Sequence, residues 1–99
     1  MADVLHDMGQ STTGGRNLCF HCPGCGYAHP VDTGRWHWNG SWDKPTFAPS
    51  LLCNQHHEPS RCHSWIVEGK IRFEADCWHK LRGSEAALPA WDETPGEGA

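Results

Sequence analysis

The chain has 99 residues, of which 37% are hydrophobic, and a formal net charge of −4 with its eight histidines neutral. This length favours one domain, and an acidic chain lacks the basic face that nonspecific nucleic-acid binding requires. No apolar run approaches the length of a membrane span and no signal peptide is visible, so we expect a cytoplasmic protein without membrane contact.

Composition divides the chain into three parts. Residues 1–15 are polar and rich in Gly, Ser and Thr, which predicts a flexible leader, and residues 92–99 are predicted to form a disordered tail. Between them, residues 16–91 are expected to form a single zinc-containing β domain. The expected fold is a small, mostly-β, zinc-stabilised domain: an antiparallel sheet with a CxxC knuckle and one or two short helical turns.

A short strand over residues 17–21 is predicted to lead into a zinc knuckle, Cys22-Pro-Gly-Cys25-Gly. Two thiolates separated by two residues can bind one metal ion, and the Pro-Gly turn brings both sulfurs together. Six cysteines without a secretory signal argue against a disulfide framework, and mixed Cys and His ligands favour zinc. We therefore expect bound Zn²⁺.

Strand patterns follow the knuckle. Residues 36–38 alternate aromatic and polar side chains, as a half-buried strand does, and Asn39-Gly40 predicts a tight turn. Residues 46–52 form a second run that is interrupted by Pro49, which predicts a bulge or a sheet edge.

The clearest element is a hairpin of residues 62–67 and 70–75 around Glu68-Gly69. This turn pairs Trp65 with Arg72 and places His63 on the face opposite the apolar core side. Residues 76–79 and 84–88 are each predicted to form a short helical turn. The core side would carry Cys62, Ser64, Ile66, Ile71, Phe73 and Ala75.

The remaining zinc ligands must come from outside the knuckle, because a structural zinc site needs four. Cys62 is the best third ligand, since it begins a strand on the core side. For the fourth we favour His79, which one helical turn would return toward the site. Three alternatives stay open for that position: His29, Cys19 and Cys77.

A catalytic triad is the second predicted site. Asp76 falls on the same face as His63, within reach to fix the tautomer of a general base. Ser50 follows Pro49, where a kink can expose a hydroxyl for nucleophilic attack. Ser50, His63 and Asp76 are therefore predicted as nucleophile, base and orienting acid. Ser64 is the alternative nucleophile, although it should point into the core.

The order of these motifs resembles the DUF6527 family of small phage and bacterial proteins, whose members often have the label "ammonia monooxygenase". About two-thirds of the chain takes part in the resemblance. The matching segments are Cys22-Pro-Gly-Cys25-Gly, Trp36-His-Trp-Asn-Gly40, Pro45-Thr-Phe-Ala-Pro-Ser50-Leu, Arg61-Cys-His-Ser-Trp-Ile66, Gly69-Lys-Ile-Arg-Phe73 and Asp76-Cys-Trp-His79. Nothing in the sequence supports a monooxygenase.

Relatives of that family occur beside bacterial ubiquitin-like conjugation genes and are similar to peptidases that process the ubiquitin-like protein. The resemblance implies a serine-type activity of Ser50 and His63 on a ubiquitin-like or other protein C-terminus, with zinc holding the fold. Two alternatives remain: a non-catalytic zinc-binding module that binds a protein partner, and a metallohydrolase that uses His63, Asp76 and His79.

Overall fold

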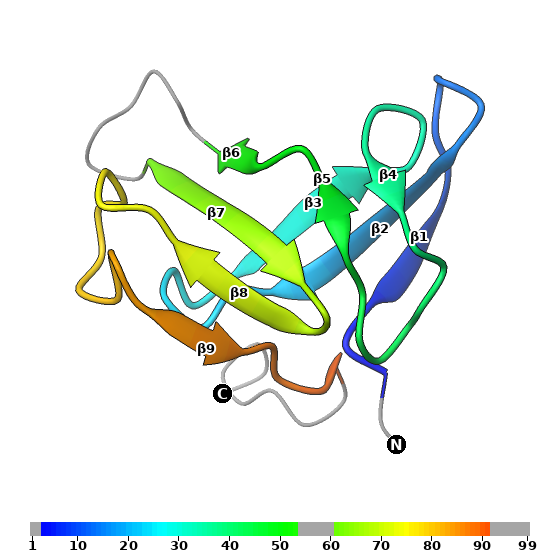
Figure 1. The fold of residues 1–99 in the computed structure, drawn as a ribbon. Helices are drawn as coiled ribbons and strands as arrows, with labels where there is room; N and C mark the ends of the chain where they lie inside the picture. The colour runs from blue at the N-terminus through cyan, green and yellow to red at the C-terminus, as the bar shows by residue number, and fades with distance from the viewer. Residues whose placement is uncertain (1–2, 54–60, 92–99) are drawn as a thin grey trace.

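The computed structural model describes residues 3–53 and 61–91, which form antiparallel strands and turns without an α-helix (Figure 1). This confirms the predicted small, mostly-β fold. The strands are β1 (His6–Gln10), β2 (Arg16–His21), β3 (Ala28–Asp32), β4 (His37–Trp38), β5 (Phe47–Ala48), β6 (Leu51–Cys53), β7 (Cys62–Val67), β8 (Lys70–Phe73) and β9 (Glu85–Ala87). The predicted tail, residues 92–99, lies outside the described residues.

These strands form three sheets, ordered β1-β2-β3, β4-β5 and β6-β7-β8-β9. In Figure 1 the four-stranded sheet lies in front of the three-stranded sheet, and buried side chains from both belong to one hydrophobic cluster. Phe20 and Val31 come from the three-stranded sheet, and Ile66, Ile71 and Phe73 come from the four-stranded one. The core is thus a single layer of side chains between sheets.

The predicted hairpin forms in the predicted register, with Trp65 opposite Arg72 and Val67 opposite Lys70. Glu68 and Gly69 both have positive φ, 49° and 80°, as a two-residue turn that follows the strand twist requires. Cys62, Ser64 and Ile66 are buried and the residues between them are not, so the core face is as predicted. Ala75 is the exception, because it lies past the end of β8 and is exposed.

Two segments differ from the sequence-based expectation. The expected leader contains β1, which pairs with β2 and is preceded by buried Val4 and Leu5. The polar composition of this segment does not indicate a strand, because β1 is stabilised by backbone hydrogen bonds to β2. Residues 84–88 contain β9 rather than a helical turn, because Glu85–Ala87 pairs with the open edge of β8.

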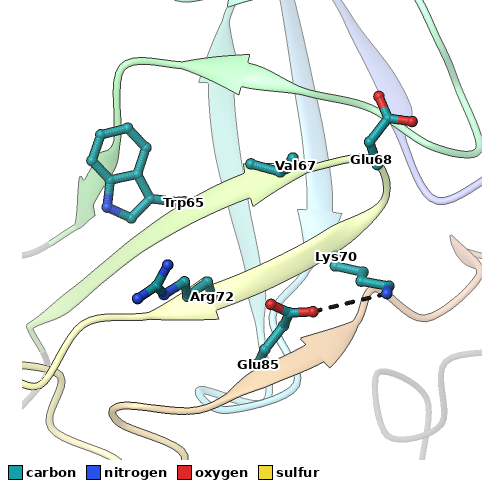
Figure 2. Close-up of a pocket in the computed structure, with 6 residues that line it drawn as sticks. All are labelled: Trp65, Val67, Glu68, Lys70, Arg72 and Glu85. Atoms are coloured by element: carbon teal, nitrogen blue, oxygen red, sulfur yellow. Dashed lines mark ion pairs between the residues drawn. The ribbon is translucent and has the colours of Figure 1, made fainter.

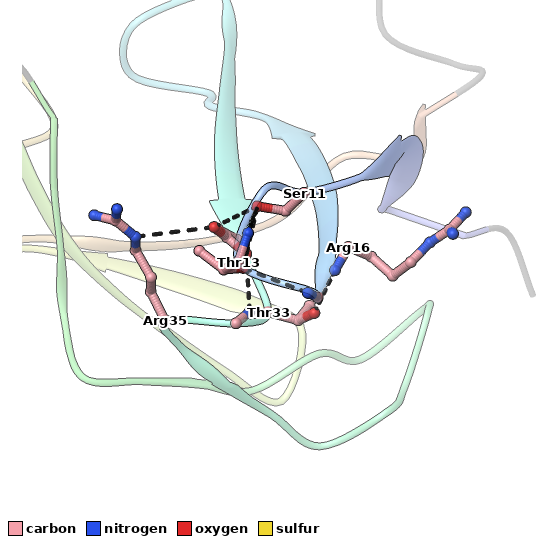
Figure 3. Close-up of polar contacts among 8 residues, drawn as sticks. Ser11, Thr13, Arg16, Thr33 and Arg35 are labelled. Atoms are coloured by element: carbon pink, nitrogen blue, oxygen red, sulfur yellow. Dashed lines mark hydrogen bonds and ion pairs between the residues drawn. The ribbon is translucent and has the colours of Figure 1, made fainter.

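The first hairpin is fixed to the turn after β3 by one carboxylate. Asp32 accepts hydrogen bonds from the hydroxyls of Ser11 (2.7 Å) and Thr13 (2.8 Å) and from the backbone N–H of Gly34 (2.8 Å). Figure 3 shows Ser11 and Thr13 in this region, together with Thr33, whose hydroxyl accepts the backbone N–H of Arg16 at 2.8 Å. Hydrogen bonding by Ser11 first, with Gly34 and Thr13, lowers the pKa of Asp32.

Trp91, the last described residue, packs against the N-terminal part of the fold. The Trp91 indole stacks on the imidazoles of His21 and His6, with ring centroids 3.9 and 4.9 Å apart. Its backbone N–H also donates to the carbonyl of Asp3 at 2.9 Å. The folded unit therefore extends from the β1 region to Trp91.

Candidate active site and metal centre

Ser50, His63 and Asp76 lie in a row. The Ser50 Oγ is 3.0 Å from the His63 Nε2, and the His63 Nδ1 is 3.3 Å from the Asp76 Oδ1. The His63 side chain is 28% exposed and that of Asp76 is 44% exposed, so substrate can reach the row from solvent. The three residues predicted from the sequence are thus brought together in the order of a serine–histidine–aspartate triad.

Strand pairing explains why Ser50 reaches His63. β6 pairs with β7 so that Leu52 is opposite His63 and both lie on the outer face of the sheet. Ser50 precedes Leu52 by two residues, which makes it the diagonal neighbour of His63 on that face. Ser64 lies on the other face and is buried, so the alternative nucleophile has no access to solvent.

A hydrogen bond to its backbone also holds the segment that carries Ser50. The Nε1–H of Trp36 donates a hydrogen bond to the backbone carbonyl of Ser50 at 3.2 Å. Pro49 and Ser50 separate β5 from β6, which belong to different sheets. No pattern in the sequence indicates this contact, because a tryptophan that hydrogen-bonds a backbone carbonyl has the same sequence signature as one that packs in a core.

Cys77 holds the catalytic-base candidate at its backbone. The N–H of His63 donates to the Cys77 Sγ at 3.2 Å, and the Cys77 thiol donates to the His63 carbonyl at 3.0 Å. That carbonyl also accepts the N–H of Glu74 at 2.9 Å. These bonds fasten the turn that carries Asp76 against β7 and set the distance between Asp76 and the imidazole. The sequence placed Cys77 only among the possible metal ligands.

A cluster of four side chains could hold a metal ion: Cys22, Cys25, His29 and Cys62, whose donor atoms all lie within 4.8 Å of one another. The Sγ atoms of Cys22 and Cys62 are 4.0 Å apart. Two sulfurs bound to one tetrahedral zinc would be separated by about 3.8 Å, given a Zn–S bond of about 2.3 Å. The donors present therefore fit a tetrahedral Cys₃His site.

His79 lies in a second group that shares Cys62. Its Nε2 is 3.7 Å from the Cys62 Sγ, and Cys77 completes this group of three. The His79 ring packs against Gly24 of the knuckle so closely that a Cβ at that position would clash with the ring. Two buried imidazole nitrogens have no hydrogen-bond partner, the Nε2 of His29 and the Nδ1 of His79. In His79 the nitrogen that lies near Cys62 is the other one, Nε2. Cys19 belongs to neither group.

Charges of opposite sign meet in the four-residue cluster. The hydrogen bond from Cys62, supported by His29, lowers the pKa of Cys22 to about 4 despite burial. The pKa of Cys62 rises, because its thiol keeps the proton in that bond and is also buried. Burial disfavours charged His29, but hydrogen bonds to Cys22 and Cys53 outweigh it and raise its pKa to about 11. A metal ion bound here would replace the proton on His29, because a protonated imidazole cannot be a ligand.

The predicted metallohydrolase trio is not brought together around one point. His63 uses its two ring nitrogens on Ser50 and Asp76, whereas His79 lies with Cys62 and Cys77. Within the described residues, the groups able to hold a metal contain neither His63 nor Asp76.

The chain was compared with protein-family models, curated proteins and solved structures. No curated protein and no solved structure matches it. Among the described residues, no helix has the length and hydrophobicity of a membrane span. A family model described as "bacterial ubiquitination-like system serine protease (BubE)" matches residues 2–74, which include Ser50, His63 and the three clustered cysteines, while Asp76 and His79 follow the matched segment. The chain therefore belongs to the BubE family of serine proteases of bacterial ubiquitination-like systems.

Proposed function

We propose that this protein is a serine peptidase that cleaves at or near the C-terminus of a protein substrate, with a ubiquitin-like protein as the substrate class. The observation that carries the proposal is the 3.0 Å contact between the Ser50 hydroxyl and the His63 Nε2, with Asp76 on the other ring nitrogen. Membership of a serine protease family supports it. The narrower resemblance to DUF6527 proteins stays a prediction.

The geometry supports a two-step acyl transfer. The Ser50 Oγ attacks the scissile carbonyl carbon and gives its proton to the His63 Nε2, which passes it to the leaving amine as the C–N bond breaks. Water then hydrolyses the Ser50 ester, again with His63 as base. Asp76 holds the proton on Nδ1 and stabilises the imidazolium that forms at each step.

In this proposal zinc is structural. A closed four-ligand site leaves no position for a reacting water, and Zn²⁺ would supply cross-linking rather than chemistry. Cys22, Cys25 and Cys62 would be three ligands. His29 completes the group of four that the described geometry favours, and the zinc content of His29→Ala and His79→Ala proteins decides between the two histidines. Free cysteines without a disulfide among the described residues are consistent with the reducing cytoplasm.

Cys62 and His63 are neighbours on β7, so the metal cluster and the proposed base share one strand. Zinc bound to Cys62 would therefore fix the start of the strand that carries His63. Metal binding and active-site geometry are linked through this single peptide unit, even though zinc takes no part in a reaction step.

Labelling of the nucleophile tests the proposal. A fluorophosphonate reagent should modify the zinc-loaded protein once per chain, at Ser50 as located by mass spectrometry. Ser50→Ala should abolish labelling while zinc content and folding stay unchanged. Ser84→Ala is the matched control, because Ser84 is an exposed serine whose hydroxyl donates only to the Leu81 carbonyl, and it should label like the wild type.

A zinc-loaded, folded protein that resists the reagent, or a Ser50→Ala variant that still reacts, would overturn the assignment. The first result would favour the alternative of a non-catalytic binding module, in which substitutions at exposed tryptophans impair function and Ser50→Ala does not.

A further inference from the structure

The outer face of the four-stranded sheet carries a groove beside the candidate active site. It has a volume of about 460 Å³ and is lined by Trp65, Val67, Glu68, Lys70, Arg72 and Glu85. Figure 2 shows these side chains on the outward side of β7, β8 and β9.

The groove lies on the same face of β7 as His63. Because side chains alternate along a strand, His63, Trp65 and Val67 share the outer face of β7, and the residues between them are buried. Trp65 lies about 7 Å and Val67 about 13 Å along the strand from His63. An extended peptide whose scissile bond lies at Ser50 would therefore reach Trp65 within two residues.

The floor of the groove is apolar and open. Trp65 is 40% exposed and Val67 is 50% exposed, although both are large hydrophobic side chains. A tryptophan and a valine two residues apart on one face form a continuous apolar strip, to which an aliphatic side chain of a ligand can bind with loss of water from both surfaces.

Four charged side chains surround this strip, and two of them pair with each other. Lys70 forms an ion pair with Glu85 at 3.9 Å, and the Glu68 carboxylate accepts a hydrogen bond from the Thr46 hydroxyl at 3.4 Å. Arg72 lies opposite Trp65 in the strand register. Among residues 3–53 and 61–91, its guanidinium contacts no carboxylate, and Figure 2 draws an ion pair for Lys70 but none for Arg72.

We propose that this groove binds an extended segment of the protein substrate that carries an aliphatic side chain next to an acidic one. The aliphatic side chain packs on Trp65 and Val67, and the carboxylate pairs with Arg72, which can bind it through two parallel N–H bonds. This inference rests on the proposed function, and it adds the substrate sequence that the site selects.

The net negative charge of the chain affects where an acidic substrate segment can bind. At a net charge of −4 the protein as a whole repels acidic segments, so an unpaired arginine beside the proposed active site selects where such a segment can bind. Asp76, at the other end of the same face, disfavours a second carboxylate next to the scissile bond. The acidic residue of the substrate is therefore expected on the Trp65 side.

Matched peptides provide the test. Two pools of internally quenched decapeptides contain Leu with either Asp or Lys one or two residues away, and are otherwise identical. The wild type should cleave the Asp pool about fivefold faster in kcat/KM, near the limit for an exposed ion pair. Arg72→Glu should reverse this order. Trp65→Ala should raise KM for both pools about tenfold with little change in kcat.

Lys80→Glu is the control, because it makes the same change of charge at an exposed lysine outside the groove. It should keep the wild-type preference. Equal cleavage of the two pools by wild type and Arg72→Glu would overturn the inference while leaving the peptidase intact, as shown by fluorophosphonate labelling of Ser50.

Peptide binding measurements test the groove independently of the proposed peptidase activity. Fluorescein-labelled versions of both pools are titrated by anisotropy against Ser50→Ala protein with and without Arg72→Glu. A preference for the Asp pool that Arg72→Glu abolishes supports the groove even if no peptide is cleaved. Sedimentation of the same proteins gives the remaining outcome: a dimer that Arg72→Glu dissociates would mean that a second copy of the chain covers this face, which overturns the inference.

Discussion

Replacing Cys77 with alanine is expected to loosen the active site without removing the metal. The Cys77 thiol both accepts from the His63 N–H and donates to the His63 carbonyl, so it must keep its proton. Burial raises the pKa of this thiol, which favours the protonated form further. A neutral thiol that donates to a carbonyl is not a metal-bound thiolate, and this argues against Cys77 as the fourth zinc ligand.

The size of the effect follows from the two hydrogen bonds. In Cys77→Ala the His63 carbonyl still accepts from Glu74, but the His63 N–H loses its acceptor. An unsatisfied, partly buried donor costs about 1–3 kcal/mol of the free energy of unfolding. Because the turn that carries Asp76 is then held less firmly, kcat should fall as well, whereas KM should change little.

Urea unfolding, zinc content and peptide cleavage measured on the same preparations check this reasoning. Cys77→Ser should recover part of the stability, because a hydroxyl also donates and accepts. Asp76→Asn is the matched control: it should lower kcat by about 10²- to 10⁴-fold and leave the free energy of unfolding within about 0.5 kcal/mol of the wild type. Loss of zinc from Cys77→Ala, or unchanged stability, would refute the role assigned to Cys77.

Two further predictions concern the fold. Cys22→Ala, or chelation of the wild type, should unfold the domain, since metal binding supplies on the order of 10 kcal/mol in zinc-finger peptides; a folded, metal-free variant by circular dichroism would contradict this. Asp32→Asn should lower the free energy of unfolding at neutral pH. The folded pKa of Asp32 lies below its ordinary 3.8, so the wild-type advantage is present above that pH and disappears as the pH falls through the folded pKa. Equal stability of the two proteins at pH 7 in urea titrations would show that the Ser11 and Thr13 contacts contribute nothing.

Local sequence patterns were sufficient to predict the hairpin and the faces of the sheet on which Cys62 and His63 lie. Alternation along residues 62–67 and a two-residue turn at Glu68-Gly69 set the register, and the register in turn put His63 on the outer face and Cys62 in the core. Both consequences follow from a side-chain period of two, which operates within a few residues and needs no knowledge of the rest of the fold.

Strands that form only by pairing with another strand could not be predicted from local sequence patterns. β1 has a polar, glycine-containing sequence, and β9 is only three residues long, so neither has a strong pattern of its own. Each exists because the edge of a neighbouring strand offers unpaired backbone groups.

The sequence by itself determined the chemistry available to this protein: a thiolate pair at a Pro-Gly turn, a histidine on an exposed strand face and a serine after a proline. Only the tertiary structure decided which groups meet. The meeting of His29 with the three cysteines, the Trp36 contact to Ser50 and the Cys77 hydrogen bonds to the His63 backbone all join segments that are distant in the chain. Such contacts depend on how whole sheets pack, and packing is set by the sum of many buried side chains rather than by any local spacing.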